Sequence, residues 1–208
     1  MRIIVCENYE EVSKKAAQMI LSQVTLKPNS VLGLATGSTP IGMYENLVSL
    51  NKKGDIDFSE VRTFNLDEYY KLPKENDQSY HYFMYKNLFD HININPENIH
   101  IPNGMTDDVD AECERYDELI KEAGGVDIQV LGIGNNAHIG FNEPTINFEK
   151  GTHLVELEES TIEANSRFFD NIEDVPKKAI TMGVGSIFKS RKIMLIATGE
   201  NKAEAIYN

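Results

Sequence analysis

The sequence predicts a single α/β domain, in which one doubly wound, mostly parallel sheet carries helices on both faces in a Rossmann-like arrangement. Three observations lead to this fold class. Short apolar runs with β-branched members alternate with longer segments whose apolar residues recur at helical spacing. No linker or low-complexity tract interrupts that alternation. Four of the predicted strands run directly into polar or glycine-rich turns, and open α/β sheets bind ligands at such strand ends.

The composition limits what the protein can be. Its 208 residues, of which 41% are hydrophobic, suffice for one well-buried domain over residues 1–208. A formal net charge of −13 argues against nucleic acid and anionic membrane as partners, so an anionic ligand would need a locally positive site. Cys6 and Cys113 lie far apart, without metal-ligand spacing, and are expected to be reduced. With no signal peptide and no membrane-length apolar run, we expect a cytoplasmic protein.

The first elements follow from the apolar spacing. Residues 3–6 predict a strand, and Asn8 is expected to cap a helix that continues to about Lys27. Residues 31–35 predict the next buried strand, which leads directly into the turn 36–40.

The turn Thr36-Gly37-Ser38-Thr39-Pro40 has the composition of an anion-binding loop. Pro40 suits the first position of the helix that follows, and Ser38 or Thr39 can cap it. Such a turn gathers free N–H groups at the positive end of a helix dipole, which favours phosphate. The ending of a Walker A loop is missing, so a nucleotide triphosphatase is not predicted. The alternative is an ordinary helix cap.

A third strand, over residues 61–66, brings Asp67 and Glu68 to its C-terminal end. One of the two carboxylates is a candidate general base, and its neighbour, which points in another direction, would be structural. Alternatively, Asp67 caps the next turn. Two helices are expected next, an aromatic one that packs in the core at residues 78–89 and another at 108–123.

The stretch 127–144 is the strongest candidate for a site. Residues 128–133 predict a strand covered on both faces, and Asn136, His138 and Glu143 follow within one polar turn. A histidine and a carboxylate at a strand end are candidates for proton transfer. The alternative is a surface loop in which both side chains cap backbone groups.

The remaining chain predicts a lid and a last strand. Residues 145–175 are polar, and Arg167 at the end of a short helix there is expected either to close over an anionic substrate or to pair with a surface acid. Residues 192–197 predict the last strand, and Lys202 follows in its turn. Parallel strands end at one edge of a sheet, so the four polar turns are expected to converge there. The convergence predicts an enzyme.

Four stretches, at residues 34–40, 64–69, 132–144 and 164–169, resemble the glucosamine-6-phosphate deaminases of the glucosamine/galactosamine-6-phosphate isomerase family. The resemblance covers essentially the whole chain. It implies conversion of glucosamine 6-phosphate and water into fructose 6-phosphate and ammonia, in amino-sugar catabolism, without a cofactor or metal. The Asp-Glu-Tyr and Phe-Asn-Glu-Pro motifs distinguish this family from the 6-phosphogluconolactonases. A lactonase-like hydrolase and a non-catalytic sugar-phosphate-binding protein of the same fold are the alternatives.

The resemblance also implies roles for individual residues. Asp67 would carry the proton between C2 and C1 of the sugar, and His138, oriented by Glu143, would open the pyranose ring. Asn136 completes the catalytic set and stands where many members carry Asp. The phosphate would be held by a further set of residues: Thr36, Gly37, Ser38, Thr39, Arg167 and Lys202.

The sequence also departs from the family pattern. Ala137 replaces a typical glycine and is expected to strain a turn that needs a positive φ. Hexameric members with an allosteric site for N-acetylglucosamine 6-phosphate carry basic residues where this chain has His153 and Val155, so we expect no such site. A monomer or a small homo-oligomer is expected. Members of the family usually continue beyond the last helix here, so the sheet is expected to lack its C-terminal element.

Overall fold

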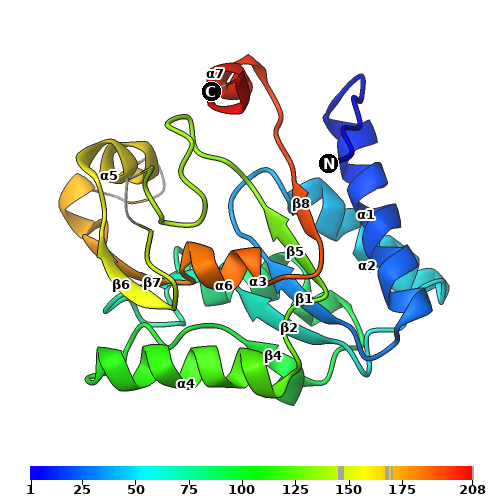
Figure 1. Ribbon diagram of the computed structural model, residues 1–208, viewed down its shortest axis with the longest axis horizontal. Helices are drawn as coiled ribbons and strands as arrows, with labels where there is room; N and C mark the ends of the chain where they lie inside the picture. Colours follow the sequence, from blue (N-terminus) through cyan, green and yellow to red (C-terminus); the bar gives the residue numbers. More distant parts are fainter. Residues whose placement is uncertain (145–147, 167–168, 170, 208) are drawn as a thin grey trace.

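The central sheet confirms the predicted fold class. The computed structural model describes residues 1–144, 148–166, 169 and 171–207 (Figure 1). Five parallel strands form the sheet in the order β4-β2-β1-β5-β8. Their bounds are β1 Val31–Leu34, β2 Arg62–Asn65, β4 Ile99–His100, β5 Ile128–Leu131 and β8 Ile193–Leu195.

The four strands that lead into the predicted polar turns are neighbours in this sheet. Strand β1 pairs with β2 on one side and with β5 on the other, and β5 pairs with β8. Because every pairing is parallel, all four strands end at the same edge. The convergence expected from the sequence is confirmed.

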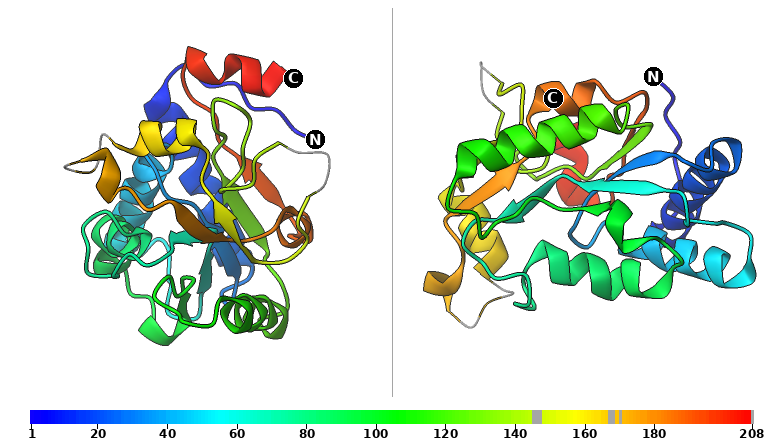
Figure 2. Two further views of the ribbon diagram at one scale, coloured as in Figure 1. Left: turned by 90° about the vertical axis from the view of Figure 1, so that its left-hand side faces the viewer. Right: turned by 90° about the horizontal axis from the view of Figure 1, so that it is seen from below.

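Helices cover both faces of the sheet, as predicted. On one face, α1 (Tyr9–Leu26), α2 (Ile41–Lys53) and α3 (Tyr80–Asn87) bury a large apolar cluster, to which each contributes fully buried side chains. On the other face, α4 (Val109–Glu122) and α6 (Val184–Phe188) pack through Tyr116 and Ile187. Figure 2 shows α4 and α3 on opposite sides of the strands.

A second, antiparallel sheet was not predicted. Its strands are β3 (Asp67–Tyr69), β7 (Lys178–Thr181) and β6 (His153–Glu156), in the order β3-β7-β6. Asp67 pairs with Thr181 in this sheet, so the carboxylate stands on a strand and not in a turn. These strands are short and mixed in polarity, so the sequence has no period-2 pattern that would predict them.

The remaining helices lie on the same side of the molecule as the polar turns. They are α5 (Glu159–Ser166) and α7 (Ala203–Tyr207). Short 3₁₀ turns also occur at residues 89–91, 96–98, 172–174 and 200–202, and the turn 96–98 leads into β4 at the opposite edge of the sheet. Figure 1 shows α5, α7 and the long loop after β5 beyond the strand ends. None of the helices in the described ranges combines the length and apolar character that a membrane crossing requires.

The predicted strand at residues 3–6 is wrong. These residues form no regular element, and the side chains of Ile3 and Val5 are 75% and 89% exposed. Their β-branched composition favours an extended chain, but a strand also needs a partner for its backbone groups. Of the two free cysteines, Cys113 is buried on α4 as expected, whereas Cys6 is only partly buried.

Candidate active site

Of the two neighbouring carboxylates, Glu68 stabilises the fold and Asp67 belongs to the candidate site. Glu68 accepts hydrogen bonds from the N–H groups of Tyr80 and His81, at 2.9 and 2.8 Å, and so holds the start of α3. This fulfils the expectation that one of the two carboxylates would be structural, and the capping alternative for Asp67 is wrong. Asp67 itself is buried, with 5% of its surface exposed.

Burial changes the acidity of Asp67. Desolvation is the main cause that raises its pKa to about 8, and the neighbouring charge of Glu68 adds to it. Burial also raises the pKa of Tyr69 and Tyr80, and the nearby charge of Asp67 raises it further. Both rings pack with each other and with Phe141 at ring-centroid distances of 4.8 to 5.9 Å. A carboxyl group with such a pKa can both hold and release a proton near neutral pH.

The imidazole of His138 lies against the backbone of Gly134. A methyl group placed on Gly134 would lie 2.4 Å from the His138 Nδ1 and Cε1 atoms, so only glycine leaves room for the ring. The loop is closed by the Gly134 N–H, which donates to the His138 carbonyl at 2.8 Å. The position of the imidazole therefore depends on a glycine four residues earlier.

Glu143 approaches His138 as predicted, but at longer range than a hydrogen bond. The His138 Nδ1 and Glu143 Oε1 atoms are 3.6 Å apart, and Nδ1 is buried without a hydrogen-bond partner among the described residues. Burial lowers the pKa of His138, the charge of Glu143 opposes this effect, and the charge of Lys202 lowers the pKa further. The imidazole is thus held neutral at pH 7 and is able to accept a proton.

Asn136 connects the two ends of the loop. Its amide Nδ2 donates to Glu143 Oε2 at 2.5 Å, and its Oδ1 accepts from the His138 N–H at 3.3 Å. An aspartate here could not donate to Glu143 and would place a second negative charge beside it. Asn136 therefore fixes the direction of the Glu143 carboxylate.

Ala137 carries the strain that the sequence predicted. Its φ is +70°, in the left-handed region that favours glycine. A non-glycine residue in this region costs on the order of 1 kcal/mol, which the rest of the loop must offset.

The loop that carries His138 passes beside Asp67 at Gly140. A methyl group built on Gly140, two residues after the histidine, would lie 3.4 Å from Asp67 Oδ2 and 3.0 Å from Thr181 Oγ1. The Phe141 N–H donates to the same Thr181 hydroxyl at 3.3 Å. The loop therefore passes directly beside the buried carboxyl, two residues after the histidine.

The turn 36–39 lies at the next strand end and offers backbone donors. Gly37 has a φ of +89°, which turns the chain sharply before α2. Within the described part of the chain, the N–H groups of residues 36–39 meet no acceptor. The predicted side-chain cap is wrong, because Pro40 occupies the N-cap position and neither Ser38 nor Thr39 bonds to the helix. These N–H groups point to anion binding more than to helix capping.

Of the other two predicted phosphate ligands, the structure describes Lys202 but not Arg167. Lys202 ends the 3₁₀ turn 200–202 and is close enough to His138 for its charge to lower the pKa of that residue. In the same turn, Asn201 donates to the Asn135 side chain at 3.2 Å, which joins the β8 end to the β5 end. Arg167 lies outside the described residues.

Three residues of the site were missed in the sequence. Thr181 contacts the loop at Gly140, Asn142 donates to the carbonyls of Ile139 and Met182, and Thr161 on α5 donates to Glu143 at 3.4 Å. Asn142 belongs to the Phe-Asn-Glu-Pro motif and could have been suspected from it. Nothing in the sequence indicates the two threonines.

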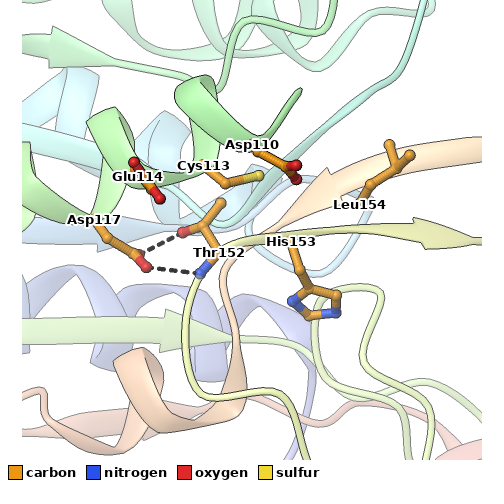
Figure 3. Close-up of a pocket in the computed structure, with 7 residues that line it drawn as sticks. All are labelled: Asp110, Cys113, Glu114, Asp117, Thr152, His153 and Leu154. Atoms are coloured by element: carbon orange, nitrogen blue, oxygen red, sulfur yellow. Dashed lines mark hydrogen bonds between the residues drawn. The ribbon is translucent and has the colours of Figure 1, made fainter. Parts of the chain in front are cut away.

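A second hollow lies away from this site, between α4 and β6. It has a volume of about 460 Å³ and is lined by acidic side chains and by His153 (Figure 3). Asp117 is structural, because it accepts from the Thr152 N–H at 2.9 Å and from its hydroxyl at 2.6 Å. Across the described ranges, no cluster of histidine, cysteine or acidic side chains is arranged to hold a metal ion.

Comparison with known proteins identifies close relatives. Residues 7–208 match the family described as glucosamine-6-phosphate isomerases/6-phosphogluconolactonase. A glucosamine-6-phosphate deaminase of Clostridium botulinum (strain Eklund 17B / Type B) is 70% identical over the whole chain, which covers 84% of that protein. One of Clostridioides difficile (strain 630) is 65% identical with the same coverage.

Solved structures show the same fold. A monomeric glucosamine-6-phosphate deaminase superposes with a TM-score of 0.96 at 46% identity, over 100% of this chain and 86% of the other. A 6-phosphogluconolactonase from Thermotoga maritima superposes with a TM-score of 0.75 at 18% identity, over 99% of this chain and 87% of the other. The second likeness concerns the fold alone.

Replacing Gly134 with alanine should displace the His138 ring, because the added methyl group has no room beside it. We expect the pKa of His138, followed by proton NMR, to rise as the ring moves toward solvent. Gly132→Ala is the matched control, since a methyl group there meets no atom within 4 Å. An unchanged His138 titration in Gly134→Ala would contradict the packing described.

Proposed function

The chain belongs to the family of glucosamine-6-phosphate isomerases and 6-phosphogluconolactonases, and we propose that it converts glucosamine 6-phosphate and water into fructose 6-phosphate and ammonia. The observation that carries the proposal is the meeting of a buried carboxyl, Asp67, with the loop that holds His138. The identities of 60–70% to proteins named glucosamine-6-phosphate deaminase support it. The lactonase alternative has only distant support, at 18–23% identity.

The phosphate group anchors the substrate in this proposal. The N–H groups of residues 36–39, after β1, and the ammonium group of Lys202, after β8, supply positive potential at the same edge of the sheet, in a chain whose net charge is −13. We also propose that residues 145–175 act as a lid and that Arg167 in this segment adds a third contact. Holding the phosphate orients the reacting carbons toward Asp67.

Ring opening is assigned to His138. Its neutral imidazole takes a proton from the sugar and returns it to the ring oxygen, which breaks the C1–O5 bond and gives the open-chain aldehyde. Glu143, held in direction by Asn136, stabilises the imidazolium form during this transfer.

Isomerisation and deamination follow at C1 and C2. Asp67 removes the proton from C2, which gives an enolamine, and returns it to C1, which leaves an imine at C2. Water then adds to the imine carbon, and ammonia leaves as the C2 ketone forms. Because one carboxyl both takes and gives the proton, a pKa near the working pH serves both steps, and burial raises the pKa of Asp67 to about 8.

The setting of this reaction is also proposed. The two free cysteines suit a reducing cytoplasm, and we assign the protein to N-acetylglucosamine catabolism as a monomer or small homo-oligomer. We propose no allosteric site for N-acetylglucosamine 6-phosphate. His153 borders a hollow whose other lining includes Asp110, Glu114 and Asp117, and three carboxylates disfavour a phosphate group.

Addition of N-acetylglucosamine 6-phosphate should leave the dependence of rate on glucosamine 6-phosphate hyperbolic, because the described residues that line the hollow beside His153 include three carboxylates, which disfavour the effector's phosphate. The measurement is a coupled assay for fructose 6-phosphate at several effector concentrations. A sigmoidal curve that becomes hyperbolic with the effector would show the proposal to be wrong.

Replacing Asp67 with asparagine should lower kcat on the order of 10²–10⁴-fold, because the proton carrier is lost. The substitution should also change how the stability of the protein depends on pH. The pKa of Asp67 is raised from 3.8 to about 8 by folding, so its stabilising contribution is complete below about pH 4 and is lost as the pH rises through about 8. Asparagine does not ionise, so the Tm of the variant relative to wild type should increase between about pH 5 and pH 9.

Asp57→Asn is the control for this stability effect. Its exposed carboxyl has a lowered pKa, caused first by the Ser59 N–H, so the substitution should bring no gain at high pH. Full turnover in Asp67→Asn would reject the role of Asp67. A Tm difference that is flat with pH would reject its buried, protonated state.

A further inference from the structure

Tyr9, the first residue of α1, reaches the turn that follows β1. Its hydroxyl lies 2.9 Å from the Ser38 carbonyl oxygen and 3.2 Å from that of Thr39, and it donates to them. The same hydroxyl accepts from the Gly42 N–H at 2.9 Å. A hydroxyl group has one proton and two lone pairs, so a single side chain joins both sides of the turn.

The ring of Tyr9 is held in place on both sides. Asn8 caps α1 by accepting the Glu11 N–H at 2.9 Å, which fixes the start of the helix. On the other side, a methyl group on Gly42 would lie 3.0 Å from the Tyr9 ring and 2.4 Å from the Ser13 hydroxyl. Glycine at position 42 therefore lets α1 approach α2 closely enough for the hydroxyl to reach the turn.

Because the peptide group is planar, this contact also sets the direction of a backbone N–H that can bind an anion. The Ser38 carbonyl and the Thr39 N–H belong to one trans peptide and point in opposite directions. Because Tyr9 holds the carbonyl, the Thr39 N–H is directed to the side away from α1. Tyr9 also takes up the Gly42 N–H, one of the donors that the first turn of α2 leaves unsatisfied.

We propose that Tyr9 is a positioning residue for the phosphate-binding turn 36–39, acting through the Thr39 peptide and without contact to the substrate. The inference rests on the proposed function, because the anion is taken to be the phosphate group of the sugar. The phosphate group is remote from the reacting carbons, so looser binding of this group weakens the substrate complex and the transition state equally. Uniform weakening raises KM and leaves kcat unchanged.

The test is Tyr9→Phe, which keeps the ring and removes the hydroxyl. We expect the KM for glucosamine 6-phosphate to rise about 5- to 10-fold, with kcat within about twofold, as for the loss of one positioning hydrogen bond. The Kd for inorganic phosphate, measured by calorimetry, should rise by a similar factor. A fall in kcat with constant KM, or an unchanged Kd, would overturn the proposal.

Two control variants separate this role from a structural one. Ser13→Ala alters the same contact between α1 and α2 without touching the turn, and Tyr82→Phe removes a hydroxyl that makes no hydrogen bond within the described residues. Both should bind phosphate as wild type does. A loss in Ser13→Ala equal to that in Tyr9→Phe would overturn the proposal. Each affinity is also measured as the rise of that variant's own Tm with phosphate, so general destabilisation does not imitate the effect.

The outcomes distinguish this inference from the proposed function. If wild type binds phosphate more tightly than Tyr9→Phe but releases no ammonia from glucosamine 6-phosphate, the function is wrong and the role of Tyr9 stands. If wild type turns over and Tyr9→Phe matches it in KM and Kd, the role of Tyr9 is wrong and the function stands. If wild type binds no phosphate, the proposed role of Tyr9 is also wrong.

Discussion

The close passage of the loop 134–143 beside the buried carboxyl of Asp67 is the constraint on which the rest of the site depends. The two meet at Gly140, where an added methyl group would crowd the Thr181 hydroxyl at 3.0 Å and touch an Asp67 oxygen at 3.4 Å. Asp67 is buried beside this loop, and burial raises its pKa to about 8. The second sheet serves this contact, because β7 holds Thr181 opposite Asp67.

Small residues recur wherever two functional segments approach. Gly134 gives room to the His138 ring, Gly140 to the Asp67 carboxyl, and Gly42 to the ring of Tyr9. At each position glycine has no side chain, which permits a close contact with the backbone. The site therefore depends on its backbone as much as on its acids and bases. Ala137 shows the opposite case, since it keeps a side chain at a φ of +70°.

Part of this could be predicted from the sequence, and part could not. The parallel strands follow from their apolar runs, and the meeting of the turns after β1, β5 and β8 follows from parallel topology. The strand at residues 3–6 was wrong, because β propensity does not supply a partner. The second sheet and Thr181 were missed, since the strands of this sheet have no periodic pattern and the pairing of Asp67 with Thr181 joins segments over 100 residues apart. Tyr9 was missed for a similar reason: its contact joins the start of α1 to the turn after β1, 29 residues later.

A crystal structure of Asp67→Asn bound to glucosamine 6-phosphate tests the central claim most directly, because the substitution slows turnover and leaves the site otherwise intact. The account predicts the phosphate on the N–H groups of residues 36–39, C2 beside Asn at position 67, and the ring oxygen toward His138. A substrate whose phosphate binds elsewhere would contradict it. So would a structure in which the His138 ring and position 67 lie on opposite sides of the loop, with no substrate between them.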